Sequence, residues 1–225
     1  EMFAASDAHN SGDKWRTHAC AKEPWTVGFI EAIPQGAHFI DIGSNVGSYT
    51  LLAVARGLNT ISIEPFYANH YMQKENLRLN GWLTQGPQNN VCEVILGALS
   101  AQSGRAFFHI GDPRFGSSSH SLGGQMNQTQ GFHTDRVATF ALDEIFAICP
   151  PQSQFYAKID VDGGELGVLQ GAGKCLASPA WQGWMIELNV QHDQAVLDLM
   201  KEAGWKIAAQ YNMRDGREIG GGVYY

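Results

Sequence analysis

The residues best suited to chemistry follow two short apolar runs of this 225-residue chain. The first run leads into FIDIGSNVG, in which Asp41 precedes two glycines. The second leads into KIDVDGGE, which contains Asp160, Asp162 and Glu165. A carboxylate at the end of a strand can bind a cationic ligand or accept a proton from a substrate, and glycines let the backbone approach a ligand closely. These two stretches therefore predict a ligand site with an acid–base function.

The sequence of the glycine turn limits the class of ligand that it could bind. It runs Gly43-Ser-Asn-Val-Gly47, which is neither GxGxxG nor GxxxxGK[ST], and it has no lysine to hold a phosphate. The carboxylate of Asp41 would repel a pyrophosphate and attract a cationic amino group. The turn therefore favours a ligand with a cationic aminoacyl tail. An alternative remains open, in which Asp41 only caps a backbone turn and the glycines only allow a helix to pack on a strand.

Another acidic residue, Glu64, ends the strand predicted after the glycine turn, about 20 residues further on. An acidic residue at this place in a nucleotide-binding fold accepts hydrogen bonds from the ribose hydroxyls. Ribose recognition together with a cationic aminoacyl tail describes S-adenosylmethionine better than NAD. The interpretation is a nucleotide-type cofactor, with S-adenosylmethionine favoured.

The acidic residues after the second run allow two interpretations. Asp160 can accept or relay a proton, or it can bind a divalent metal together with Glu187 and Asn189; such oxygen ligands suit Mg²⁺ or Ca²⁺, although we expect no metal. Alternatively, Glu165 complements the positive end of a helix and Asp162 stabilises a turn. We predict Asp160 and Glu165 as the catalytic residues.

A long polar segment, residues 111–131, separates two stretches that resemble strands. Its length and its content of Gly, Ser, Asn and Gln predict a mobile lid or substrate loop. Two of its serines could hydrogen-bond to the acceptor, and three histidines of the chain compete as bases. These residues are Ser118, Ser119, His120, His133 and His192.

The elements that must position these residues alternate along the chain. Helical spacing of apolar residues covers 23–33, 45–57, 68–81 and 194–205, and short apolar runs predict strands in 37–43, 59–65, 91–100, 155–160 and 184–189. This order predicts an α/β fold with a parallel sheet and right-handed crossovers. Residues 206–225 read as a terminal hairpin, residues 1–22 as an extension or cap, and 1–225 as a single domain.

Composition limits the partners. The formal net charge is −7 and the isoelectric point is near 5.5, which disfavours nucleic acid as a partner. No apolar run is long enough to span a bilayer, so we expect no membrane association. Four widely spaced cysteines without a CxxC pair predict free thiols. With no visible secretory signal, these features predict a cytoplasmic protein.

The motifs together resemble the FkbM family of S-adenosylmethionine-dependent methyltransferases. FIDIGSNVGSYTLLA, ISIEP, ENLRLNG, LGALS, LDEI, KIDVDGGELGVLQGA and MIELN occur in the family's order, over roughly residues 22–190. The resemblance implies a class I methyltransferase fold, Rossmann-like and three-layered. Its seven-stranded sheet is mostly parallel, with one antiparallel strand in the terminal hairpin. Members of the family mostly methylate hydroxyl oxygens on sugars, glycans or polyketide-like products, so the resemblance also implies a small-molecule or glycan acceptor.

The resemblance further implies roles for individual residues. Those expected to wrap the methionine part of the cofactor are Asp41, Gly43, Ser44, Asn45 and Gly47. Those expected around the rest of the cofactor are Glu64 at the ribose, Pro65, Phe66, Gly97 and Ala98 at the adenine, and Asp160 near the methyl group. Asp162 stands where the family more often has Glu, and its shorter side chain puts a direct role in doubt. The competing predictions are an NAD-dependent oxidoreductase and a non-catalytic binding module on the same fold.

Overall fold

The structure is a computed structural model. It describes residues 20, 23–118, 120–123, 133–147, 152–188, 193–214 and 217–224. For residues 147, 193, 212–214 and 217–224 it describes the backbone only. Within the described ranges, no helix combines the length and the apolar character that crossing a membrane requires. Cys20, Cys92 and Cys175 are free thiols, as predicted, and Cys149 lies outside the described residues.

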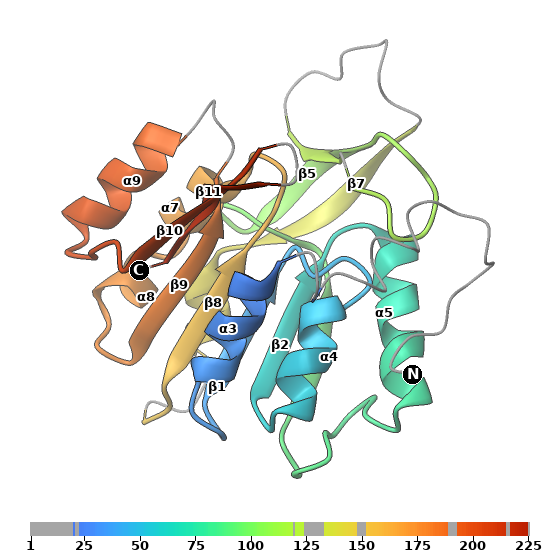
Figure 1. Ribbon diagram of the computed structural model, residues 1–225. Coiled ribbons are helices and arrows are strands. Elements are labelled where there is room, and N and C mark those ends of the chain that lie inside the picture. Colours follow the sequence, from blue (N-terminus) through green and yellow to red (C-terminus); the bar gives the residue numbers. More distant parts are fainter. Residues whose placement is uncertain are drawn as a thin grey trace.

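The fold is built on a seven-stranded sheet in the order β10-β11-β9-β8-β1-β2-β3 (Figure 1). The five strands from β9 to β3 pair in parallel, and β11 is antiparallel to both of its neighbours, as the sequence predicted. The strands are β1 (His38–Ile42), β2 (Asn59–Glu64), β3 (Cys92–Leu96), β8 (Phe155–Ile159), β9 (Trp181–Glu187), β10 (Ala209–Arg214) and β11 (Arg217–Tyr224).

Helices cover both faces of this sheet and complete three layers (Figure 1). One face carries α3 (Pro24–Ala32), α4 (Ser48–Ala55) and α5 (Tyr67–Leu79). The other carries α6 (Leu142–Ala147), α7 (Glu165–Gln170), α8 (Gly173–Ala177) and α9 (Asp193–Glu202). Helix α3 starts with Pro24, whose missing N–H is harmless in the first turn, and it ends before Pro34, which cannot continue it.

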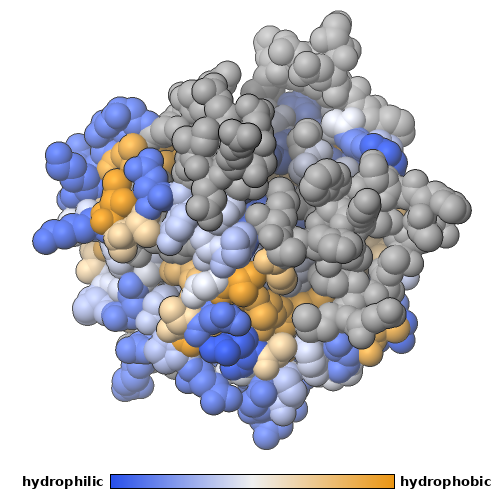
Figure 2. All heavy atoms as spheres, in the orientation of Figure 1, coloured by the Kyte–Doolittle hydropathy of each residue, from blue (hydrophilic) through white to orange (hydrophobic). Residues whose placement is uncertain are grey.

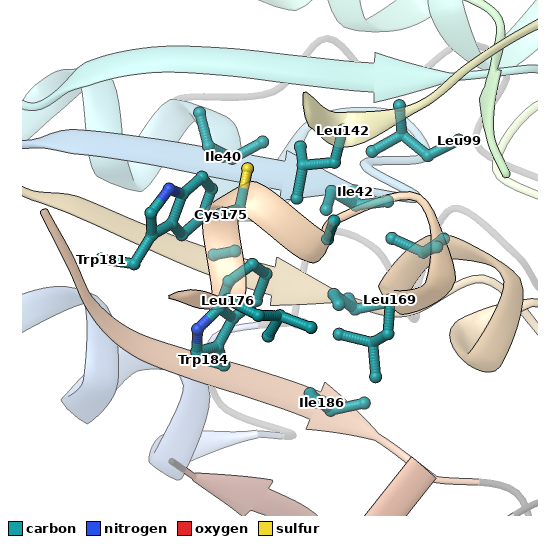
Figure 3. Close-up of a cluster of buried hydrophobic side chains, with 14 of the residues drawn as sticks. Ile40, Ile42, Leu99, Leu142, Leu169, Cys175, Leu176, Trp181, Trp184 and Ile186 are labelled. Carbon is teal, nitrogen blue, oxygen red and sulfur yellow. The ribbon is translucent and has the colours of Figure 1, made fainter. Parts of the chain in front are cut away.

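The larger core lies between the sheet and helices α6 to α9. Figure 3 shows isoleucines of β1 and tryptophans of β9 meeting side chains of the helices across this space. The indole rings of Trp181 and Trp184 stack with centroids 4.4 Å apart. Both are nearly buried, so apolar burial on this face is a main source of stability.

The opposite face has a smaller apolar cluster under α3 and α4, built around Phe39 of β1. Figure 2 shows hydrophobic residues, in orange, gathered at the front of the molecule where Figure 1 places α3 and α4. Ile30 of α3 and Ala53 of α4 are both fully buried there. These helices therefore pack on the sheet against Phe39 of β1 and Tyr156 of β8.

A second sheet, in the order β4-β7-β5-β6, was not predicted. Residues 91–100 were expected to form one strand, but β3 ends at Leu96 and β4 (Ala98–Leu99) pairs with β7 (His133–Phe140) instead. The chain turns at Gly97, where a Cβ atom would lie 2.7 Å from the ring of Phe140. The other strands are β5 (Gly104–Ile110) and β6 (Ser121–Leu122). The predicted substrate loop thus contains a strand, and residues 119 and 124–131 of it lie outside the described residues.

Candidate active site

A cavity of about 980 Å³, including its open mouth, lies at the carboxyl ends of the parallel strands. Its walls come from β1, β2, β8 and β9, from the turns after them, and from the second sheet. Ligands of open α/β sheets bind at this edge, where the order of strands reverses on either side of β1. The two stretches that opened the sequence analysis both reach this cavity.

The glycine turn after β1 forms one wall and needs its glycines. Gly43 has a φ of 77°, and a Cβ atom there would lie 1.8 Å from the carbonyl oxygen of Asp160. Gly47 has a φ of 85°, and a Cβ atom there would lie 2.6 Å from Cγ of Gln73. The first glycine lets β1 and β8 end side by side, and the second lets α4 start against α5.

Glu64 presents a fixed carboxylate to the cavity. Its Oε2 accepts a hydrogen bond from the backbone N–H of Asn45 at 2.9 Å, and its Oε1 accepts one from the N–H of Phe66 at 2.9 Å. The side chain is nearly buried and lines the cavity. A carboxylate oxygen can accept more than one hydrogen bond, so this carboxylate could also accept hydrogen bonds from a pair of vicinal hydroxyls.

An apolar compartment lies beside Glu64. The predicted Pro65, Gly97 and Ala98 line it, and the second sheet adds Phe108, His120 and Leu122. Phe66 is buried behind this wall, and its ring centroid lies 4.6 Å from that of His120. Flat rings and small aliphatic groups form a slot that suits a planar base.

Two asparagines hydrogen-bond to the loop before β6, beside this compartment. The carbonyl oxygen of Ser117 accepts hydrogen bonds from Nδ2 of Asn45 at 2.9 Å and of Asn69 at 3.1 Å. The N–H of Gly116 donates to Oδ1 of Asn69 at 2.8 Å. Asn45 adopts a φ of 52°, a left-handed conformation that asparagine tolerates. The glycine turn and the loop are therefore one connected unit.

Acidic side chains gather at the opposite end of the cavity, where Glu23, Asp160, Asp162 and Glu187 all line it. Asp162 has a φ of 52°. The nearby Asp160 carboxylate and desolvation raise the pKa of Glu187 to about 9, which favours its protonated form. The Glu187 side chain is open to the cavity, so water screens part of this effect. Asp160 and Glu187 thus share one proton between neighbouring strand ends.

Five predicted site residues do not line the cavity: Asp41, Ser44, Gly47, Phe66 and Glu165. The Asp41 carboxyl is fully buried beneath the turn, and its Oδ2 accepts a hydrogen bond from the Thr50 hydroxyl at 2.6 Å. Burial raises the pKa of Asp41, while the nearby Lys158 lowers it. The structure therefore places Asp41 beneath the glycine turn and outside the cavity lining, and its contact with an aminoacyl tail stays a prediction.

Ser44 belongs to the same buried layer. Its hydroxyl donates to Oε1 of Gln73 at 2.9 Å, and Nε2 of Gln73 donates to the hydroxyls of Thr50 at 2.9 Å and Ser62 at 2.7 Å. These polar side chains satisfy one another between the sheet and the helices α4 and α5. Their contribution is to fix the position of the glycine turn.

Glu165, predicted as catalytic, is 2% exposed and lies in the first turn of α7. Its Oε1 accepts a hydrogen bond from the N–H of Gly163 at 3.1 Å. This geometry favours the alternative interpretation, in which Glu165 stabilises the turn and the start of the helix. Its catalytic role stays a prediction that this placement does not favour.

The remaining candidates divide by position. His120 and Ser118 line the cavity, whereas His133 lies in β7 with its Nε2 2.9 Å from Oδ1 of Asp135. Ser119, Asn189 and His192 lie outside the described residues. Among the residues that the structure describes, no three histidine, cysteine, aspartate or glutamate side chains come together as a metal-binding group.

Several residues of this site were not predicted from the sequence. Glu23 lines the cavity from the start of α3, and its Oε2 accepts a hydrogen bond from the Tyr49 hydroxyl at 2.7 Å. Lys158 lies behind Asp160, with Nζ 2.8 Å from Oδ2. Alternation along β8 could have predicted the position of Lys158 beside Asp160, because residues two apart on a strand share a face. No local pattern pointed to Glu23.

The strand order, the three layers and the cavity at the strand ends together define a class I, Rossmann-like methyltransferase fold. The Methyltransferase FkbM domain matches residues 41–207, and the chain belongs to this family. No curated protein sequence matches it significantly.

Solved structures support the fold. Magnesium protoporphyrin IX methyltransferase (ChlM) from Synechocystis PCC 6803, solved with bound SAM, has a TM-score of 0.54 at 9% identity, covering 100% of this chain and 86% of that one. The METTL16 methyltransferase domain has a TM-score of 0.54 at 11% identity, covering 99% of this chain and 71% of that one. At such low identity these likenesses establish the fold and leave the substrate open.

Proposed function

We propose that the protein transfers a methyl group from S-adenosylmethionine to a hydroxyl oxygen of a sugar, a glycan or a polyketide-like small molecule. The observation that carries this proposal is the position of the Asp160 carboxylate. It lines the acidic end of the cavity and is paired with a buried cation, Lys158. A hydroxyl is a poor nucleophile at neutral pH, and a carboxylate held at the reacting end can take its proton.

The residues present fit the cofactor. Glu64 can accept hydrogen bonds from the two ribose hydroxyls, and the slot around Ala98 and His120 suits the adenine. Gly43 and Asn45 of the glycine turn line the cavity, where their backbone groups could contact the aminoacyl part. Glu23 and the acidic strand ends then surround the positively charged groups. In this proposal the carboxyl groups that line the cavity, and not the buried Asp41, attract the cationic aminoacyl tail.

When bound, S-adenosylmethionine supplies an electrophilic methyl group on a sulfonium, which leaves as a neutral thioether after in-line displacement. The protein aligns the acceptor hydroxyl and removes its proton. Asp160 would accept that proton on a carboxylate oxygen. Asp160 raises the pKa of Glu187, so Glu187 would keep its proton and donate a hydrogen bond to Asp160, which helps to hold that carboxylate in place.

The charge of the acceptor end supports the choice of substrate class. Four carboxyl groups line that end, from Glu23, Asp160, Asp162 and Glu187. They would repel a phosphate-rich polymer and would accept hydrogen bonds from a polyhydroxylated molecule. A neutral sugar or polyketide-like acceptor fits this surface better than a nucleic acid.

Calorimetry and an acceptor screen test the proposal. We expect S-adenosylmethionine and S-adenosylhomocysteine to bind, NAD not to bind, and labelled methyl groups to appear on at least one hydroxylated acceptor. Binding of NAD alone would contradict the cofactor assignment. Cofactor binding with transfer only to nitrogen or carbon would contradict O-methylation, and binding without any transfer would favour a non-catalytic module.

A further inference from the structure

Lys158 is a charged side chain buried inside the protein. It is 3% exposed, lies one residue before the end of β8, and does not line the cavity. Burying an ammonium without a partner is very costly, so a lysine in this position needs compensation. The groups around it show what the charge does.

The nearest partner is Asp160. Nζ of Lys158 lies 2.8 Å from Oδ2 of Asp160, with side-chain exposures of 4% and 29% respectively. The lysine is therefore the inner end of the pair and the aspartate is the end that meets the cavity. The Lys158 ammonium also lies 5.2 Å from the ring centroid of Tyr49, on α4, and Lys158 is paired in register with Asp41 of β1.

The backbone of Asp160 is fixed independently of Lys158. Its N–H donates to the carbonyl oxygen of Ile42 at 3.0 Å, and its own carbonyl oxygen lies against Gly43. A fixed backbone does not by itself orient the carboxylate. The ion pair to Lys158 constrains the side chain from the buried side, and the hydrogen bond to Glu187, which lines the cavity, adds a second constraint.

We propose that Lys158 is a positioning residue, which holds the Asp160 carboxylate ionised and directed at the acceptor hydroxyl. This inference rests on the proposed methyl transfer, because it assigns Asp160 the task of taking the proton. Lys158 itself touches neither acceptor nor cofactor. It acts through Asp160.

Lys158 does not serve as the base itself. Burial alone would lower the pKa of its ammonium, but Asp160 and Asp41 together raise that pKa above its usual value, so it stays protonated. A protonated lysine outside the cavity cannot accept a proton from an acceptor. Its constant positive charge instead opposes protonation of Asp160 before an acceptor arrives.

The kinetic test uses Lys158→Met, Lys158→Arg, Asp160→Asn and the double variant Lys158→Met/Asp160→Asn, with the exposed Lys174→Met as a matched control. We expect Lys158→Met to lower kcat about 10–100-fold, with S-adenosylhomocysteine affinity within about threefold. The acidic limb of the pH–rate profile of Lys158→Met should move to higher pH. Lys158→Arg should recover part of the kcat that Lys158→Met loses. Lys174→Met should behave like the wild type.

The double variant decides whether Lys158 acts through Asp160. We expect it to be no slower than Asp160→Asn alone, because the carboxylate that Lys158 serves is already gone. If the double variant instead shows the product of the kcat losses of the two single variants, the inference is overturned. An unchanged pH profile in Lys158→Met would also overturn it. If Lys158→Met does not fold, Lys158→Gln replaces it, because glutamine can still donate a hydrogen bond but lacks the charge.

A readout without methyl transfer separates this inference from the proposed function. In protein with ¹⁵N-labelled lysine, we expect a slowly exchanging ammonium resonance for Lys158, assigned by its absence in Lys158→Met. Asp160→Asn should shift or broaden it and leave the Lys174 resonance unchanged. A Lys158 resonance that does not respond to Asp160→Asn overturns the inference even if the enzyme transfers methyl groups. A wild type that transfers none contradicts the proposed function, while the ion pair is still tested.

Discussion

The two faces of the central sheet differ sharply at the same level of the strands. In consecutive register rows across β2, β1, β8 and β9, one face carries Ile63, Ile42, Ile159 and Ile186. The neighbouring row, which points to the other face, carries Ser62, Asp41, Lys158 and Met185. All eight side chains lie in the interior.

The isoleucine row packs into the larger core with Leu169 of α7 and Cys175 of α8, close to the residues shown in Figure 3. Each of these side chains gains stability in proportion to the apolar area it buries. This row therefore contributes to folding and contains no group that could take part in catalysis.

The polar row costs stability unless each member finds a partner. Thr50 donates to Asp41, Gln73 donates to Ser62, and Lys158 donates to Asp160. These partners lie in α4, in α5 and at the end of β8. One face therefore holds the sheet together while the other holds the site in position, across the same four strands.

The largest expected effect on the polar face is that of Asp160→Asn. We expect kcat to fall about 10²–10⁴-fold, because asparagine cannot accept the proton, while S-adenosylhomocysteine affinity changes little. Steady-state kinetics and calorimetry measure the two effects. Asp162→Asn is the matched comparison, since asparagine also tolerates the left-handed φ at this position. We expect it to lower kcat by less than about tenfold. The reverse ranking would assign the base to Asp162.

The isoleucine face is tested by Ile159→Ala. We expect the free energy of unfolding to fall by about 2–5 kcal/mol, because a fully buried side chain leaves a cavity in the core. Denaturant titration measures this change. Ile159→Val should cost only about 0.5–1.5 kcal/mol. A fall in kcat in the folded Ile159→Ala protein, without a change in stability, would break the proposed division between the faces.

Glu64→Gln tests the cofactor end. We expect about 10–100-fold weaker binding of S-adenosylhomocysteine, because an amide nitrogen would face a backbone N–H in place of a carboxylate oxygen. A 2′-deoxy analogue gives the control: it should bind the wild type more weakly than S-adenosylhomocysteine and should not be discriminated by the variant. Equal discrimination in both proteins would remove Glu64 from ribose recognition.

The smallest effect is expected for Glu187→Gln. Because the pKa of Glu187 is raised to about 9, glutamine mimics its protonated form, and we expect kcat near pH 7 to stay within about threefold. A raised carboxyl pKa stabilises the fold below the ordinary pKa, and this contribution is lost as pH rises through the folded value. The wild-type melting temperature should therefore fall more between pH 5 and pH 9 than that of the variant. Parallel curves would show that Glu187 is ionised at neutral pH.

Much of the fold followed from local pattern. Apolar spacing predicted α3, α4, α5, α9 and the five parallel strands, and the terminal hairpin was expected from its turn. The second sheet was not predicted, because β4 has two residues and its pairing partner β7 lies about 40 residues away in the chain. Such short strands depend on their partners for stability more than on their own sequence.

The sequence by itself determined the alternation of strands and helices, the glycine turn, and acidic residues at the ends of β2 and β8. Each of these depends on backbone conformations and side-chain periods that neighbouring residues set. Only the tertiary structure decided that Asp41 lies behind the cavity, that Glu23 reaches it, and that Lys158 stands beneath Asp160. The physical reason is register. Which buried charges meet across β1 and β8 depends on the pairing of strands that are more than a hundred residues apart in the chain.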